Sequence, residues 1–416
     1  MIISKYINYF IFFLLPIFLI FSPFLSELII IISLLFFIFF VIKNNLIKYY
    51  FFNYYTIFFL IWCLYLILLS LSSINVYLSL QSSLFYFRFC LFSLAFYFFY
   101  KNYRNLINYL FLGFFISITC LTLDSILQYL TNYNILGYEY FNYRVSSFFG
   151  DEHKMGYYSL FATLTSISIL FLTNNKFLQY YKTFFLFTLF ICVNILVVLS
   201  GERKALVLLL IFDFTYIIIF KSFRVQILSA ILSILTVVVI LVFLNPDFKN
   251  RFINQTFDQL QSEDKKIYIF SEMYEAHYIT ATNIFLDNKV FGVGPKIYRE
   301  ICNDPKYYYS KYSCTTHPHH AFLQLLSETG IVGTVPFIFL FFFSIYKMFP
   351  ILLFSIISKN ENTNNSKIAF FFLILAFVFI LLPIVPSGNV FNNWNSMLHF
   401  IPISILLSML GIIKHD

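Results

Sequence analysis

The sequence predicts an all-α integral membrane protein of about 12 transmembrane helices. The first observation is composition: 60% of the residues are hydrophobic and 11% are charged, whereas a soluble domain carries about 25% charged residues. The second is a series of apolar runs near the roughly 20 residues that cross a bilayer. The third is the gathering of basic residues in alternate loops, so the net charge of +8 indicates loop orientation and not nucleic-acid binding.

The apolar runs give the bounds of the expected spans. They are Ile7–Phe24, Leu28–Ile42, Tyr54–Leu71, Ser83–Tyr100, Leu106–Leu123, Tyr157–Thr173, Thr183–Leu199, Ala205–Phe220, Gln226–Leu244, Ala321–Tyr346, Ile368–Val385 and Ser396–Ile413. The second run is short for a span, and the pattern of the fifth continues toward Tyr129.

The basic residues orient these spans. One side receives Lys5, Lys43, Lys48, Lys101, Arg104, Lys176, Lys182, Lys221, Arg224, Lys347, Lys359, Lys367 and Lys414. The alternate short loops, Ser72–Gln81 and Pro386–Asn395, contain no Lys or Arg. Positive residues favour the cytoplasm, so both termini are expected there. The first helix lacks a small-residue cleavage site and is expected to remain as an anchor.

Three outer segments depart from the pattern of short loops: Asp124–Gly156, Ser200–Lys204 and Asn245–His320. Long loops within compact proteins are usually functional or disordered. The largest contains a helix-compatible stretch over Ser271–Leu286. We therefore expect one integral membrane domain, with nine helices and the periplasmic segment 124–156 in residues 1–244, a periplasmic loop in 245–320 and three helices in 321–416.

The cysteines fall into two groups. Those inside the expected spans are interpreted as small apolar residues; they are Cys63, Cys90, Cys120 and Cys192. Cys302 and Cys314 lie in the large outer loop, where an oxidising compartment favours a disulfide. Such a bridge would contribute about 3 kcal/mol. Two unpaired thiols or a metal role are the alternatives.

Charged groups near membrane depth are functional candidates because each is costly there. Arg88 is expected about one and a half turns inside the outer end of the fourth span. Arg203 and Lys204 lie at the outer mouth of the eighth span, and Asp213, deeper in it, receives no role. Arginine presents fixed donors that match phosphate oxygens, so these cations suit a lipid diphosphate. Ordinary interfacial anchoring is the alternative.

A histidine-rich segment, Thr316–Gly333, opens the tenth span. His317, His319 and His320 gather where the outer loop enters the membrane, and Glu328 follows His319 by nine residues. Histidine titrates near neutral pH and suits general-base work. Zinc binding is a second interpretation, although no fourth ligand stands at a recognised spacing. Helix entry at a wet interface is a third.

The order of these segments resembles the O-antigen ligase and O-antigen polymerase superfamily. That family carries a His, usually an Asn, nine residues and then Gly-x-x-Gly, often with Thr-Val; here these are His319, His320, Gly330, Gly333 and Thr334–Val335. Leu323, Leu326 and Glu328 also fit its spacing. Ser200–Ala205 resembles its Ser-Gly-x-Arg-x-Ala segment, Phe291–Pro295 its Gly-x-Gly element and Arg144–Asp151 the segment before the sixth span.

The resemblance implies a type-C glycosyltransferase-like fold and a metal-independent, inverting transfer without cofactors. The donor would be an undecaprenyl diphosphate-linked glycan and the site would face the periplasm of a bacterial inner membrane. His319 would deprotonate the acceptor hydroxyl, and Arg203 would hold the diphosphate. The family has a second arginine in the large loop, for which Arg299 is preferred and Arg251 is possible. The His at position 320 departs from the usual Asn, so the base could be shared between two rings.

Several functions stay open at this point. A ligase would transfer the glycan to a lipid A core sugar, and a polymerase to another lipid-linked repeat; the form of the His–Gly pattern favours the ligase. A transporter or flippase of about 12 helices is another class. Its ionisable groups would gather near the midplane, whereas the candidates here gather at the outer third. A structural membrane subunit would leave His319 replaceable.

Overall fold

The computed structural model describes residues 2–140, 144–244, 246–260, 270–358 and 364–411. Within these ranges the secondary structure is helical apart from one isolated bridge between Tyr133 and Glu139. Lys359 and Lys414, which helped to orient the chain, lie outside the described residues, as do Asn245 and residues 261–269 of the large outer loop.

The helices that correspond to the expected spans have the following bounds. They are α1 Ile2–Phe21, α2 Pro23–Lys43, α4 Tyr54–Leu71, α6 Phe87–Asn102, α7 Leu106–Thr131, α8 Met155–Leu172, α10 Lys182–Ser200, α11 Arg203–Ile219, α12 Arg224–Leu244, α17 Ala321–Ile357, α18 Asn365–Leu381 and α19 Asn393–Leu410. Short helices lie between them: α3 Ile47–Phe51, α5 Val76–Ser83, α9 Lys176–Tyr180, α13 Pro246–Lys249, α14 Gln255–Leu260, α15 Glu272–Asp287 and α16 Tyr298–Ile301.

Every expected span overlaps one of these helices. Among the described residues, 8 helical stretches are long and apolar enough to cross a membrane, and two shorter apolar helices accompany them. The chain is therefore a helical protein with membrane-spanning character, and the total of about 12 spans stays a prediction. The helix α7 runs on to Thr131, as the continuing apolar pattern indicated.

In the fourth expected span a short turn at residues 84–86 separates α5 from α6, and the stretch Val76–Asn102 as a whole is long and apolar enough to cross a membrane. Serine hydroxyls hold α5 in place: Ser70 Oγ lies 2.7 Å from Ser83 Oγ and 2.8 Å from Ser79 Oγ. Arg88 lies in the first turn of α6, within the apolar stretch Val76–Asn102, and its depth in a membrane stays a prediction. Its Nη1 donates to the Phe85 carbonyl at 2.8 Å.

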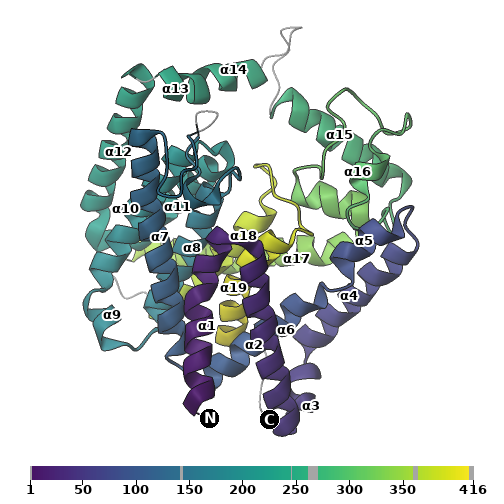
Figure 1. Cartoon of the computed structure of the whole chain (residues 1–416), viewed down its shortest axis with the longest axis horizontal. Helices are drawn as coiled ribbons and strands as arrows, with labels where there is room; N and C mark the ends of the chain where they lie inside the picture. The colour runs from purple at the N-terminus through teal and green to yellow at the C-terminus, as the bar shows by residue number, and fades with distance from the viewer. Residues whose placement is uncertain (1, 141–143, 245, 261–269, 359–363, 412–416) are drawn as a thin grey trace. The chain divides into compact units, whose positions relative to one another are not determined.

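The chain divides into two compact units. The first contains residues 1–29, 99–257 and 346–376, and the second contains residues 30–98, 258–345 and 377–416. In the first unit α8 is the central helix, buried along nearly all of its length and packed against α7, α10 and α11. The helices α1 and α7 pack side by side in the same unit (Figure 1).

In the second unit, α15 and α16 form a small core with the segment that follows them. Ala281 and Ile284 of α15 pack with Tyr298 and Cys302, all fully buried. A disulfide joins Cys302 to Cys314, the pair that the sequence had singled out. The helix and the bridge together order the part of the outer loop that leads into the histidine-rich segment.

Segments expected on the outer side meet one another within each unit. In the first unit, the Val145 amide donates to the Leu199 carbonyl at 3.1 Å. In the second, the Ser387 amide donates to the His319 carbonyl at 2.8 Å, and Asn75 Nδ2 donates to Glu300 at 3.4 Å. These contacts join segments that were expected on one side, and the orientation of the chain in a membrane stays a prediction.

Candidate functional site

Three arginines of the first unit, Arg144, Arg203 and Arg251, form what we call the arginine cluster. Arg144 Nε donates to the Ser200 carbonyl at 3.1 Å. Arg251 donates twice to the Gly201 carbonyl, from Nε at 3.0 Å and from Nη2 at 2.8 Å. Arg203 Nη2 lies 3.4 Å from the Arg251 carbonyl. Three cationic side chains thus converge on the turn between α10 and α11.

The turn attracts these side chains because it ends a helix. α10 stops at Ser200, and Gly201 takes the left-handed conformation, with φ of +58°, that commonly terminates helices. The last carbonyl groups of a helix lack intrahelical partners and accept hydrogen bonds from other donors. A side chain at Gly201 would also crowd Arg144 and Arg251, since an added Cβ would lie 3.3 Å from each. Glycine is therefore required here for both conformation and space.

A separate hydrogen-bond network at the outer end of α7 holds the segment that carries Arg144. Gln128 Oε1 accepts the Ser146 and Ser147 amides at 3.2 and 2.7 Å. Asp124 accepts the Ile135 amide at 2.9 Å and the Ser147 hydroxyl. Both side chains are buried, so the outer segment that carries Arg144 is fixed to α7.

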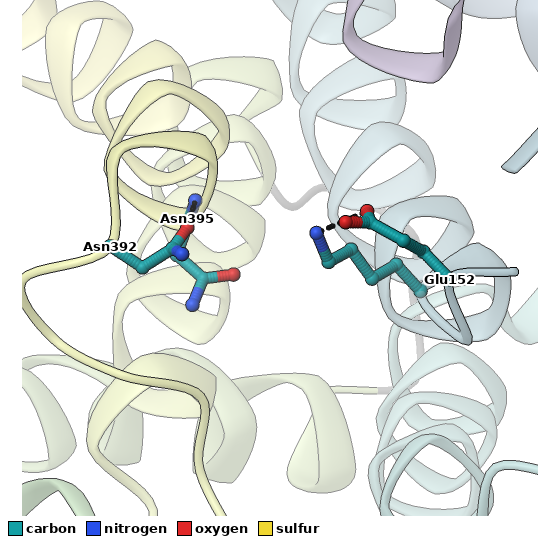
Figure 2. Close-up of polar contacts among 4 residues, drawn as sticks. Glu152, Asn392 and Asn395 are labelled. Carbon is teal, nitrogen blue, oxygen red and sulfur yellow. Dashed lines mark hydrogen bonds and ion pairs between the residues drawn. The ribbon is translucent and has the colours of Figure 1, made fainter. Parts of the chain in front are cut away.

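The positive charge of the arginine cluster affects the pKa of neighbouring side chains. Burial, followed by Arg144 and Arg251, lowers the pKa of His153 to about 4, so this ring is neutral at pH 7. Glu202, buried in the turn, accepts the Gly156 amide at 2.7 Å. Burial raises the pKa of Glu202 to about 6, and Arg144 opposes that shift. Nearby, Glu152 forms an ion pair with Lys154 (Figure 2).

Four histidines of the second unit, His277, His317, His319 and His320, form what we call the histidine cluster. The His317 and His319 ring centroids lie 4.0 Å apart, and those of His277 and His319 lie 5.5 Å apart. The ring of His320 meets Tyr278 edge-on at 5.2 Å. His277 belongs to α15, so the outer loop contributes to this cluster as well as the entry of α17.

His320 serves as the cap of α17. Its Nδ1 accepts the Leu323 amide at 3.3 Å, the bond that an N-cap side chain makes three residues into a helix. Asparagine is a favoured residue for that position, so histidine here replaces the usual Asn in the same structural task. Burial lowers the pKa of His320, which keeps Nδ1 available as an acceptor.

His317 and His319 differ in how they are held. His317 is buried, with Nε2 3.3 Å from the Ser387 carbonyl and Nδ1 3.0 Å from the Thr316 hydroxyl. His319 is half-buried and has a φ of +57°. Residues other than glycine adopt that conformation uncommonly, and such strain clusters at functional sites. Within the histidine cluster, His319 is the member with this left-handed backbone.

The glycine motifs bring the outer loop against α17. Gly330 has a φ of +60° and kinks the helix, and an added Cβ would lie 2.2 Å from the Val290 carbonyl oxygen. A Cβ on Gly292 would lie 2.5 Å from the carbonyl carbon of Glu328. At this close approach, the Gly294 amide donates to Glu328 at 2.9 Å and the Ile331 amide to Lys289 at 2.8 Å. Main-chain hydrogen bonds therefore join the loop to the kinked helix.

Glu328 lies at the centre of a buried polar network. Gln324 Nε2 donates to its Oε2 at 3.0 Å, and the Tyr298 amide lies 3.4 Å from its Oε1. The same Nε2 donates to Asn389 Oδ1 at 2.9 Å. In the loop that carries Asn389, Asn392 caps α19 by accepting the Asn395 amide at 3.1 Å (Figure 2). The network links α17 to the loop that contacts the histidines.

Gly333 lies one turn beyond the kink, where an added Cβ would be 2.3 Å from Thr329 Oγ1. The Gly333 carbonyl lies 3.4 Å from Trp62 Nε1 of α4. Tyr65, one turn further along α4, donates to the Thr329 carbonyl at 2.6 Å. Close packing within the second unit therefore explains both glycines of the Gly330–Gly333 pattern.

The remaining predicted arginines have other neighbours. Arg299 Nη2 donates to the Thr316 carbonyl at 3.0 Å, beside the histidine cluster. Arg88 lies over the Phe89 ring at 4.6 Å. Arg251, the second choice from the sequence, is the loop arginine next to Arg203. Arg203 and Arg251 belong to the first unit, and Arg88, Arg299 and the four histidines to the second.

Sequence reasoning assigned no role to Arg144 or His277. Arg144 stood within a recognised motif, and its type alone could have suggested an anion contact. His277 had a weaker signal, since it begins a buried face at helical spacing with Thr280, Ala281 and Ile284. Among the described residues, no group of three or more His, Cys, Asp or Glu side chains is placed to hold a metal ion.

Comparison with known proteins adds one finding to this geometry. Residues 185–338 match a family model described as O-Antigen ligase. A search of curated proteins found no match to the chain. The matched segment begins within α10 and ends within α17, and it includes Arg203, Arg251, Arg299 and all four residues of the histidine cluster.

Proposed function

We propose that the chain transfers a glycan from undecaprenyl diphosphate to a sugar acceptor, because residues 185–338 match a family model described as O-Antigen ligase. The observation that carries the proposal is that the matched segment contains both Arg203 and His319. Membrane helices are the expected setting for a lipid-linked donor.

In the proposed reaction, the arginine cluster binds the donor diphosphate. Guanidinium groups match phosphate oxygens with paired donors. Arg144 and Arg251 are fixed by the carbonyls of the turn that precedes Arg203, so their charges are held without a bound ligand. We assign Arg203, with Arg251 and Arg144 beside it, to stabilising the charge on the leaving diphosphate. In this proposal the three cations neutralise the charge on the diphosphate, as a divalent metal does in other transferases.

His319 is the proposed general base. It removes the proton from the acceptor hydroxyl, whose oxygen forms a bond to the anomeric carbon as the bond from that carbon to the diphosphate oxygen breaks. The products are an inverted glycoside and undecaprenyl diphosphate. His320 is engaged as a helix cap and His317 contacts Ser387, which favours His319 for the proton transfer.

The proposed location is the periplasmic face of a bacterial inner membrane, with both termini in the cytoplasm. The basic loops support this orientation. The meeting of the Arg-free and Lys-free loop Pro386–Asn395 with the His319 segment supports placing that segment outside.

The test is turnover of an undecaprenyl diphosphate glycan by the purified protein in vesicles, with and without lipid A core oligosaccharide. A ligase produces glycan-bearing core and releases the lipid diphosphate, and the form of the Gly330–Val335 segment favours this outcome. A polymerase lengthens the lipid-linked glycan without core. Unchanged donor under both conditions would refute the proposed function.

A further inference from the structure

His277 is a buried polar residue beside the proposed base, and the mechanism above does not use it. It lies on α15, whose N-cap Ser271 accepts the Tyr274 amide at 3.3 Å. The side chain is 3% exposed, and its ring centroid lies 5.5 Å from that of His319. Such burial requires an explanation for each ring nitrogen.

The two ring nitrogens have different environments. The Tyr312 backbone hydrogen-bonds the ring and favours its protonated form, which identifies the backbone as acceptor from a ring N–H. Nδ1 is buried and has no hydrogen-bond partner among the described residues. Burial lowers the pKa of His277 to about 4, so the ring is neutral at pH 7. A neutral ring with one N–H engaged presents a lone pair at the other nitrogen.

The surroundings of this lone pair suit a sugar. The Tyr274 ring lies 5.5 Å from the His319 ring and 6.1 Å from the His277 ring. Tyr278, one turn along α15 from Tyr274, meets the ring of His320 edge-on and adds a second aromatic contact. Small-molecule sites combine aromatic surfaces with a few placed polar groups. A glycan offers apolar ring faces to the tyrosines and hydroxyl donors to an acceptor nitrogen.

We propose that Nδ1 of His277 accepts a hydrogen bond from a hydroxyl of the acceptor sugar, next to the hydroxyl that His319 deprotonates. This inference rests on the proposed function, and it assigns binding of the acceptor sugar to α15. His277 is then a binding residue for the acceptor, and the unpaired nitrogen acquires its partner when the acceptor is present. Leaving a buried acceptor unsatisfied is costly, so the interaction favours the bound state.

Two substitutions of His277 distinguish the role of Nδ1 from that of Nε2. The Asn amide occupies the place of Nδ1, whereas the longer Gln amide occupies that of Nε2. His277→Asn should keep the acceptor KM within about twofold of wild type, and His277→Gln should raise it about fivefold, the value of one neutral hydrogen bond. The donor KM should not change in either variant. An acceptor lacking the bonded hydroxyl should weaken wild type and leave His277→Gln unaffected.

The result can also contradict the inference. A greater loss in His277→Asn than in His277→Gln would show that the Tyr312 contact matters and that Nδ1 binds nothing. A shifted pH–rate profile without a change in acceptor KM would show that His277 positions His319. Acceptor binding, measured by calorimetry in detergent without donor, provides a readout that needs no turnover. Wild-type binding of the acceptor without any transfer would contradict the proposed function and leave the acceptor site standing.

Discussion

The arginine cluster and the histidine cluster are held by opposite means. The guanidinium groups of Arg144 and Arg251 donate to the carbonyls that end α10, and their charge persists at any physiological pH. In the histidine cluster, burial keeps His277 and His320 neutral, and His319 carries backbone strain. The first region supplies fixed charge and the second supplies a group that can take up a proton. Substitutions in the two regions should therefore fail in different ways.

The largest effect is expected at His319. Replacing it with Ala should reduce the transfer rate by about 10³-fold, the typical contribution of a general base. His319→Asn is the matched variant, because Asn tolerates a positive φ and preserves the loop. Both rates are measured with saturating donor and acceptor. Activity in His319→Asn near that of wild type would remove the residue from the proton transfer.

Substitutions of Arg203 should distinguish the effect of its charge from the effect of its paired hydrogen-bond donors. Arg203→Ala should lower the rate by about 10²-fold, as loss of a preorganised charge-stabilising donor does. Arg203→Lys keeps the charge but loses the paired donors, so it should recover only part of the rate. The donor KM is measured in parallel at two salt concentrations. Equal activity in the Lys variant and wild type would show that charge alone is needed.

Gly330 tests the packing of the second unit. Gly330→Ala should destabilise the protein by about 3 kcal/mol or more, because its Cβ would meet the Val290 carbonyl 2.2 Å away. Gly137→Ala is the control, since Gly137 also has a positive φ, of +87°, but no atom within 4 Å of the added Cβ. That control should lose about 1 kcal/mol. Thermal unfolding in detergent measures both, and equal losses would contradict the close approach.

The smallest effect is the pH dependence of stability. The folded pKa of His277 is about 4, below its ordinary value of 6.5, so its contribution is complete above pH 6.5 and is lost as the pH falls toward 4. Glu202 in the arginine cluster has a raised pKa of about 6, so its contribution is present below pH 4.5 and is lost as the pH rises through 6. We expect at most about 3 kcal/mol for His277 and about 2 kcal/mol for Glu202.

Unfolding of His277→Gln and Glu202→Gln across pH 4 to 7 measures these contributions. Relative to wild type, His277→Gln should lose less stability on acidification, and Glu202→Gln should lose more. Parallel pH curves for wild type and both variants would show that neither group titrates differently on folding.

Apolar run length was sufficient to predict the long helices, because each expected span overlaps one of them. The bounds of α4 match the expected span. The break at residues 84–86 could not be predicted, because the local sequence there is apolar and contains neither Gly nor Pro. The helix α17 continues past Tyr346 to Ile357, because Lys347 at its surface does not end it.

The candidate site was predictable in its residue types but not in its grouping. Arg203 and His319 stood out by motif. The position of Arg251 beside Arg203 depends instead on the path of the chain after α12. A short π-helical segment, Asn250–Asn254, brings Arg251 to the turn at Gly201, and no local signal announces it. His277 escaped notice because a lone histidine on a buried helix face resembles a core residue.

The paired glycines of the second unit have a mechanical consequence. Main-chain bonds from the neighbours of Gly292 and Gly330, such as Gly294 to Glu328 and Ile331 to Lys289, tie the loop to α17 without intervening side chains. Because this connection is rigid, a tilt of the outer half of α17 would move Arg299 and the disulfide-closed loop with it. The thickness of the surrounding bilayer thereby becomes a variable that can tune the geometry above the helix.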